Sequence, residues 1–114
     1  TFEFAEADVA KLLKAGVPPA KICLGVPFYG RGIQGRSKTL AYADIVRKYQ
    51  PAADVDEVEG LYFNGPQTIE RKTKLALSKK LGGIMIWELG QDAPGDASLL
   101  RVIQRTADGL AQKK

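Results

Sequence analysis

The residues best suited to binding or catalysis lie together late in the chain, where the only tryptophan, Trp87, is followed by Glu88, Gln91 and Asp92. Before them runs an unbroken apolar stretch bounded by glycines, within residues 83–90. Such a short run predicts a strand buried on both faces, as in a parallel sheet. Ligands of parallel α/β proteins collect at the carboxyl ends of strands. An aromatic plate beside carboxylates at that end suits the flat face of a sugar ring.

A second apolar run over residues 22–28 predicts another strand buried on both faces, with Pro27 near its end because a central strand needs every backbone donor. Residues 29–32 then turn out of the strand, and they begin with Tyr29. We expect Tyr29 and Trp87 to lie on one rim, where flat apolar faces meet sugar rings and polar tips meet hydroxyls. The alternative is that Trp87 is an ordinary core residue, since tryptophan is often largely buried.

Segments with helical periodicity must position these strands. We expect helices over residues 5–15, 40–49 and 66–81, and a last helix that follows Asp96. Thr39 and Asp96 are the expected N-caps, and a possible small hairpin lies within residues 50–63. Pro66 should occupy the first helical position of its helix, after Asn64 and Gly65. The apolar positions that we expect to be buried are Val9, Leu12, Leu13, Ile45, Tyr49, Ile69, Thr73, Ala76, Leu77, Leu99, Ile103, Ala107 and Leu110.

This order of helices and strands indicates right-handed βαβ crossovers and a parallel sheet. Two long strands cannot close a barrel or complete a doubly wound sheet. The sequence therefore predicts an α/β architecture that is incomplete by itself.

Composition narrows the classes of function. The chain has 114 residues, enough for one domain, with 45% hydrophobic and 26% charged residues, as in soluble globular proteins. It has no run long enough to span a membrane and no signal-peptide pattern at its start. The absence of histidine excludes Ser-His and Cys-His triads and most zinc sites, and the single Cys23 cannot form an internal disulfide. We predict no cofactor and no metal.

The net charge of +4 is mild, and the basic residues are not interleaved with aromatics as nucleic-acid binding would require. We therefore expect no nucleic-acid or membrane partner. The basic residues instead predict a solvated helix face, formed by Arg71, Lys72, Lys74, Lys79 and Lys80.

Two further motifs suggest chemistry that we do not favour. Residues 30–35 match the dinucleotide pattern G-x-G-x-x-G, and Asp54 follows at about the distance of a ribose-binding acid. The mechanism needs a helix to begin inside the glycines, whereas four polar residues intervene here, so a flexible loop is the preferred interpretation. The acidic cluster at residues 54–59 lies in a turn-rich connection, and we interpret it as a solvated loop rather than as paired catalytic carboxylates.

The two apolar runs and their exits resemble the C-terminal part of the family 18 glycoside hydrolases, the chitinase family. Residues 21–32 look like the seventh barrel strand of that family and its exit, and residues 83–92 look like its eighth strand. Residues 64–72 are similar to the start of the helix between them. The resemblance covers essentially the whole chain. It implies a C-terminal fragment of a (β/α)8 TIM barrel that contains roughly the last two strands and their flanking helices.

The resemblance also implies what the fragment does. Family members hydrolyse β-1,4 bonds between N-acetylglucosamine units by substrate-assisted retention, in which the N-acetyl oxygen attacks and a glutamic acid protonates the leaving oxygen. That glutamate ends a D-x-x-D-x-D-x-E motif, which this chain lacks, together with the Met-x-Tyr-Asp stretch of the sixth strand. We therefore expect no catalytic residue here and no activity from the chain alone. The expected substrate-binding residues are Trp87 as the stacking floor, Tyr29 as a groove wall and Glu88 as a hydroxyl contact.

We treat residues 1–114 as a single incomplete domain, in which residues 33–63 are a shortened form of an insertion that walls the cleft of many chitinases. The expected partners are chitin or N-acetyl chito-oligosaccharides, and either the missing N-terminal part of the barrel or a second copy at the open sheet edges. Family resemblance implies a secreted or extracellular location. Two alternatives stay open: a non-catalytic chitin-binding lectin of the same fold, and a purely structural fragment that self-associates.

Overall fold

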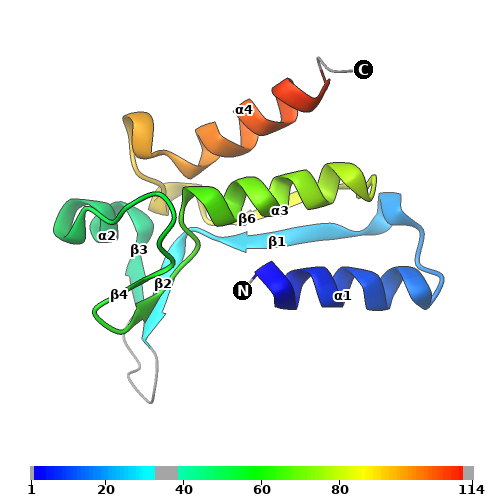
Figure 1. Cartoon of the computed structure of the whole chain (residues 1–114), viewed down its shortest axis with the longest axis horizontal. Helices are drawn as coiled ribbons and strands as arrows, with labels where there is room; N and C mark the ends of the chain where they lie inside the picture. Colours follow the sequence, from blue (N-terminus) through cyan, green and yellow to red (C-terminus); the bar gives the residue numbers. More distant parts are fainter. Residues whose placement is uncertain (1, 33–38, 112–114) are drawn as a thin grey trace.

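The computed structural model describes residues 2–32 and 39–111, and side chains as far as residue 109. Two strands and three long helices form the larger part (Figure 1). Four short strands and one helix form the smaller part. In chain order the elements are α1 (Phe2–Lys14), β1 (Cys23–Pro27), β2 (Tyr29–Gly32), β3 (Thr39–Ala41), α2 (Tyr42–Tyr49), β4 (Glu57–Val58), β5 (Leu61–Tyr62), α3 (Pro66–Ser78), β6 (Gly83–Trp87) and α4 (Leu99–Ala111), with single 3-10 turns at Pro19–Lys21, Leu89–Gln91 and Gly95–Ala97.

The two expected long strands pair in parallel, as the sequence predicted. Cys23 of β1 lies opposite Gly83 of β6, and the register continues to Pro27 opposite Trp87. Pro27 is the last residue of its strand, where its missing N–H costs no ladder bond. A helix, α3, follows the first strand and leads back to the second, and Figure 1 shows α1 and α3 running alongside the pair.

The prediction that both strands are buried on both faces is wrong for this chain. Alternate residues of a strand point to opposite faces, and only one face is covered. We call this the helix face; it consists of Leu24, Val26, Phe28, Ile84 and Ile86, which pack against the buried core. We call the other the open face; it consists of Cys23, Gly25, Pro27, Gly83, Met85 and Trp87.

The core lies between the helix face and the helices. Its most deeply buried members include residues of α2, α3 and α4, so these three helices bury apolar side chains in one shared interior. A second, smaller cluster joins α1 to β1 and α3 through Val9, Leu24 and Leu75. The main cluster consists of Val26, Phe28, Tyr42, Ile45, Phe63, Ile69, Ala93, Leu99 and Val102.

The smaller part of the molecule begins where the turn after β1 was expected. Residues 29–32 form strand β2 instead, one of the two inner strands of an antiparallel sheet in the order β3-β2-β5-β4. The expected hairpin is confirmed as β4 against β5, with Val58 opposite Leu61. Gly30 sits where an added Cβ would lie only 2.7 Å from the Ile45 side chain, so glycine lets the sheet approach α2.

The structure corrects several predicted helix boundaries and several predicted buried positions. Thr39 belongs to β3, so α2 begins after Ala41 and Thr39 caps nothing. Helix α3 starts at Pro66 as predicted but ends at Ser78, not Leu81. Leu12 and Leu77 are exposed, whereas Leu75, Val102 and Thr106 are buried. Val9, Ile45, Ile69, Thr73, Ala76 and Leu99 are buried as expected, Leu13, Tyr49, Ile103 and Ala107 are half-buried, and Leu110 and residues 33–38 lie outside what the structure describes.

Lys72 departs most from its sequence interpretation. We expected it on a solvated basic face, but only 4% of its surface is exposed, while Arg71, Lys74, Lys79 and Lys80 are exposed. Within the described part of the chain, no helix combines the length and apolar character that crossing a bilayer requires.

Candidate functional site

The carboxyl ends of β1 and β6 bring the predicted aromatic residues to one end of the parallel sheet. Phe28, which follows β1, donates its backbone N–H to the carbonyl oxygen of Trp87 at 2.8 Å. Tyr29 is the next residue and opens β2, half-buried, so it starts from the same end of the sheet as Trp87. Glu88 continues from Trp87 through a cis peptide bond and is exposed. The structure therefore gathers all three predicted residues at this rim.

Trp87 is not a core residue in this structure, because 62% of its surface is exposed. An indole this open presents a large apolar surface to solvent at a strand end, with Glu88 beside it. Met85, two residues earlier, is 57% exposed on the same open face. The methyl group of Met85 lies 3.4 Å from the position that a Cβ on Gly25 would take, so these strands share one face here. The open face thus forms an apolar floor that ends in an aromatic plate.

Asp92 was expected to share the polar surface of this rim, but it is tied into the loop. Its carboxylate accepts hydrogen bonds from the backbone N–H groups of Ala93 (2.8 Å), Leu99 (2.7 Å) and Leu100 (3.1 Å) and from the Ser98 hydroxyl (2.7 Å). These bonds satisfy donors at the start of α4, which would otherwise lack partners. Asp92 therefore fixes the loop and is not free to bind a ligand with those lone pairs.

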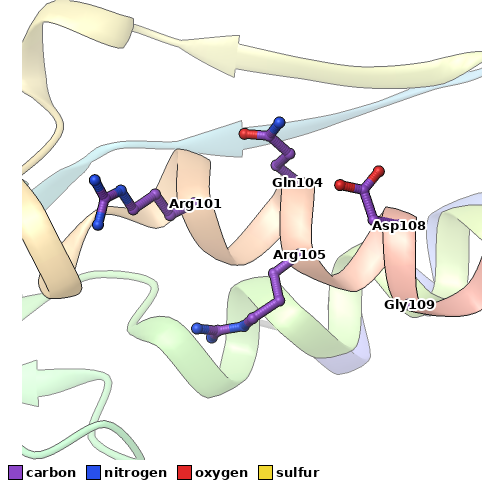
Figure 2. Close-up of a pocket in the computed structure, with 5 residues that line it drawn as sticks. All are labelled: Arg101, Gln104, Arg105, Asp108 and Gly109. Carbon is purple, nitrogen blue, oxygen red and sulfur yellow. The ribbon is translucent and has the colours of Figure 1, made fainter.

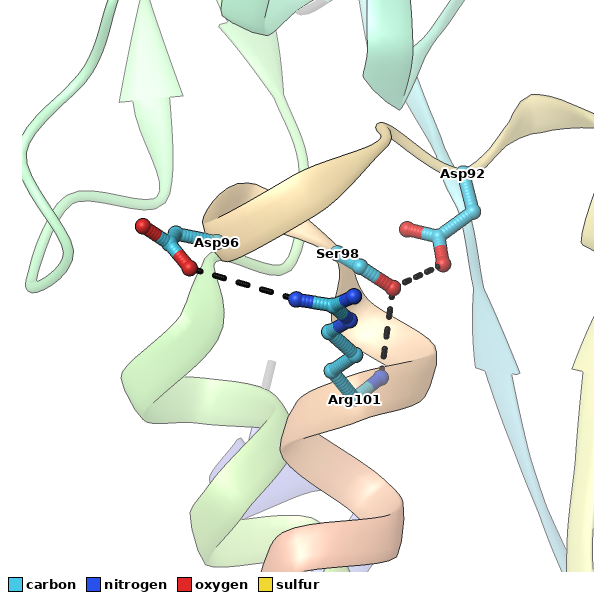
Figure 3. A network of polar contacts seen from close by, with 4 residues as sticks. All are labelled: Asp92, Asp96, Ser98 and Arg101. Carbon is cyan, nitrogen blue, oxygen red and sulfur yellow. Dashed lines mark hydrogen bonds and ion pairs between the residues drawn. The ribbon is translucent and has the colours of Figure 1, made fainter.

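The predicted cap Asp96 does not cap α4. Ser98 directly precedes the helix, and its hydroxyl accepts the N–H of Arg101 at 3.2 Å (Figure 3). The Asp96 carboxylate is exposed and meets only the Arg101 guanidinium at 3.9 Å. The sequence carried a usable signal, since Ser98 with helical residues from Leu99 onward fits the preference of serine for the N-cap.

The acidic cluster at residues 54–59 also contains a structural residue. Asp56 accepts the Gly65 N–H at 2.8 Å and the Thr68 hydroxyl, so it closes the N-terminal end of α3. Asp54, Glu57 and Glu59 are exposed, as a solvated loop requires. The interpretation as a solvated loop therefore holds for those three and is wrong for Asp56.

Lys72 is the second ionisable group that the sequence interpretation missed. Its ammonium group donates to the Asn64 side-chain oxygen in a buried position. Burial lowers the pKa of Lys72, and the negative charge of Asp56 opposes that shift. Asn64 and Lys72 also line a cavity of about 400 Å³ between α1 and β1. Positions 68, 69, 72 and 76 share one side of a helix, and this spacing was the available signal.

Tyr42 is the third residue that we missed. It is 2% exposed, and its hydroxyl donates to the Ala97 carbonyl oxygen at 2.9 Å. Burial, with the negative charge of Asp92 adding to it, raises the pKa of Tyr42 to about 12. The spacing of Tyr42, Ile45 and Tyr49 follows one helical stripe, so the pattern contained this position although we named only the other two.

A second depression, of about 470 Å³, lies on α4 (Figure 2). All of its described lining residues belong to this one helix, and Arg105 points away from Gln104 and Asp108 in the close-up. Side chains that do not converge cannot hold one ligand together. Among the described residues, no group of three or more His, Cys, Asp or Glu side chains could hold a metal ion.

The fold and the rim define the class of protein: an α/β protein in which two parallel strands, joined through a helix, carry exposed Trp87 at their carboxyl ends. The family model for glycosyl hydrolases family 18 matches residues 3–92, so the chain belongs to that family. It is similar to Endochitinase 1 of Metarhizium robertsii, with 29% identity over 77% of this chain and 27% of that protein.

Two solved structures are similar in fold. One is a family 18 chitinase from the chitin utilization locus of Flavobacterium johnsoniae, with a TM-score of 0.86 and 40% identity over 96% of this chain and 36% of that chain. The other is a chitinase from Bacteroides thetaiotaomicron, with a TM-score of 0.83 and 28% identity over 93% of this chain and 38% of that one. The chain therefore spans between about a quarter and two fifths of these relatives. The assignment to a partial (β/α)8 barrel is confirmed.

Proposed function

We propose that this chain is the sugar-stacking part of a glycosidase that hydrolyses β-1,4-linked N-acetylglucosamine polymers. Trp87 is the floor on which a sugar ring lies, Tyr29 is a wall of the groove and Glu88 contacts hydroxyl groups. The observation that carries the proposal is the 62% exposure of Trp87 at the carboxyl end of β6. An indole is costly to leave in water, and stacking a sugar ring over it would remove apolar area from solvent.

The chemistry belongs to the whole protein. Substrate-assisted retention needs a carboxylic acid that protonates the leaving oxygen and a second carboxylate that orients the acetamido group. The sequence contains no D-x-x-D-x-D-x-E motif, and Asp92 does not replace it, because its carboxylate is engaged by the α4 backbone. We therefore propose that the chain by itself binds chito-oligosaccharides and does not hydrolyse them. A location outside the cell stays a prediction.

We propose that residues 33–63 are a shortened form of the insertion that walls the cleft of many chitinases. Their described part folds as β3, α2, β4 and β5 against β2, which itself begins at the rim with Tyr29. A small sheet at this place would give a lower wall than a large inserted subdomain. We propose that the groove is shallow and open, and that chitin or its oligomers are the partners.

The test is a titration of the 114-residue chain with N,N′,N″-triacetylchitotriose, followed by the fluorescence of the single tryptophan. A saturable change supports the proposal, and maltotriose at the same concentrations should give none. Tyr29→Ala should weaken binding, whereas Tyr62→Ala, which removes a partly exposed aromatic from β5, should not. Calorimetry extends the comparison to Trp87→Ala, which should not bind. A flat titration, or release of reducing ends by the pure chain, would contradict the proposal.

A further inference from the structure

Tyr42 stands at the junction between the antiparallel sheet, the two parallel strands and the loop that follows Trp87. Its backbone N–H donates to the Phe28 carbonyl oxygen at 2.9 Å, and the Phe28 N–H donates to the Trp87 carbonyl oxygen at 2.8 Å. Its hydroxyl donates to the Ala97 carbonyl oxygen at 2.9 Å. Tyr42 is thus connected to both ends of the segment that runs from Trp87 to Ala97.

This segment has little packing of its own near the rim. Trp87 is 62% exposed and Leu89 is 58% exposed, so side-chain burial does not determine where they lie. Beyond these two residues, the segment is held by the hydrogen bonds at its ends, by the Asp92 carboxylate in its middle and by Ala93, which is buried in the main cluster. Asp92 anchors residues 93, 98, 99 and 100, and Figure 3 shows its bond to Ser98 beside the start of α4.

The anchor itself is rigid. The Tyr42 ring lies within the core, with its centroid 6.3 Å from that of Phe63 and the two rings tilted by 43°. A buried ring has few alternative rotamers, so the direction of its hydroxyl is set by packing. With a pKa of about 12, the hydroxyl also keeps its proton at neutral pH and remains a donor.

We propose that Tyr42 is a positioning residue for the sugar-stacking rim: through its hydroxyl, α2 holds the segment after Trp87 in place and so sets the position of the indole. Tyr42 does not touch the sugar. The inference deepens the proposed function and rests on it. It also assigns a role to the small sheet and α2, since the insertion then orients the floor of the groove.

The experiment compares Tyr42→Phe with two matched controls in the 114-residue chain. Tyr42→Phe removes the hydroxyl and keeps the ring. Tyr49→Phe makes the same chemical change on the same helix, seven residues away. Val9→Ala lowers stability from the separate cluster of Val9, Leu24 and Leu75, which does not include Trp87 or the segment after it. This last variant controls for a loss of affinity that comes only from a less stable fold.

Two readouts are needed. Triacetylchitotriose affinity, from Trp87 fluorescence, should fall about threefold to tenfold in Tyr42→Phe, as expected for one buried hydrogen bond, and by less than about twofold in both controls. Hydrogen exchange without sugar should become faster in residues 88–98 of Tyr42→Phe than in the rest of that chain. In Val9→Ala any increase should be centred on α1 and β1.

The outcomes separate the two proposals. If the unmutated chain binds the sugar and Tyr42→Phe binds equally well, the positioning role is wrong and the proposed function stands. If the unmutated chain does not bind, the proposed function fails, and exchange in residues 88–98 still decides the role of Tyr42. Unchanged exchange there overturns it, and faster exchange supports it.

Discussion

The two faces of the β1–β6 sheet differ in how deeply their large apolar side chains are buried. On the helix face, Phe28 is completely buried and Val26 is 2% exposed. On the open face, Met85 and Trp87 are more than half exposed. Large apolar side chains are present on both faces, so hydrophobicity alone does not explain the difference. What differs is the presence of partners: α3 and α4 cover one side, and nothing in the described chain covers the other.

This contrast is expected when only part of a barrel is present. In a (β/α)8 barrel, one face of every strand packs against helices and the other fills the barrel interior. The open face is that interior, with glycines at positions 25 and 83 and large apolar residues at 85 and 87. Part of this surface is therefore suited to burial by the rest of a barrel, and its carboxyl end is suited to a sugar ring.

The largest expected effect compares one truncation on each face. Phe28→Ala should cost about 3–5 kcal/mol, because it leaves a cavity in the core, and this loss could unfold the chain. Met85→Ala should change the free energy of unfolding by about 0.5 kcal/mol or less, since its side chain is already in water. Urea unfolding followed by circular dichroism measures both. Equal losses would mean that the open face is covered in solution.

The next largest effect concerns the pH dependence of stability that buried Tyr42 should cause. Tyr42 ionises near pH 10 when unfolded and near pH 12 when folded, so its raised pKa favours the folded chain below pH 10. This contribution disappears as the pH rises from 10 to 12, a loss of about 2–3 kcal/mol. The difference in free energy of unfolding between the natural chain and Tyr42→Phe should therefore change by this amount between pH 10 and pH 12. Parallel curves would show that Tyr42 is not buried as described.

The loop that joins the two sides supplies a matched pair of aspartates. Asp92→Ala should cost about 1–2 kcal/mol, because the first N–H groups of α4 lose their partner. Asp96→Ala should change stability by less than about 0.5 kcal/mol, since only an exposed ion pair with Arg101 is lost. Thermal unfolding distinguishes them. The reverse order would restore Asp96 as the cap.

The smallest expected effect concerns lysines of one helix. Burial lowers the pKa of Lys72 below 10.5, so between that lowered value and 10.5 the unfolded chain binds more protons and stability should rise with pH. Lys72→Met should remove this rise. Lys74→Met, which loses only an exposed pair with Glu70, should retain it. A pH series of unfolding free energies provides the comparison, and identical slopes for the two variants would be inconsistent with a buried Lys72.

Local pattern was sufficient for much of the fold. Short apolar runs located β1 and β6, and proline after Asn64 and Gly65 located the start of α3, because strand burial and the fixed φ of proline act through the local sequence. It failed at Thr39 and Asp96, where a residue suited to capping lies near a helix but tertiary contacts select another start. It also failed at Lys72, because a charged side chain becomes buried only when distant residues supply its partners.

The sequence by itself determined the parallel pair of strands, the family and the residues that reach the rim, since each of these depends on composition and order along the chain. Tertiary structure alone decided which face of the sheet is covered, which aspartate holds α4 and how Tyr42 joins α2 to the segment after Trp87. Each of those outcomes depends on groups far apart in sequence: Tyr42 and Ala97 are 55 residues apart. Local preferences carry no information about such distant partners, and packing brings them together.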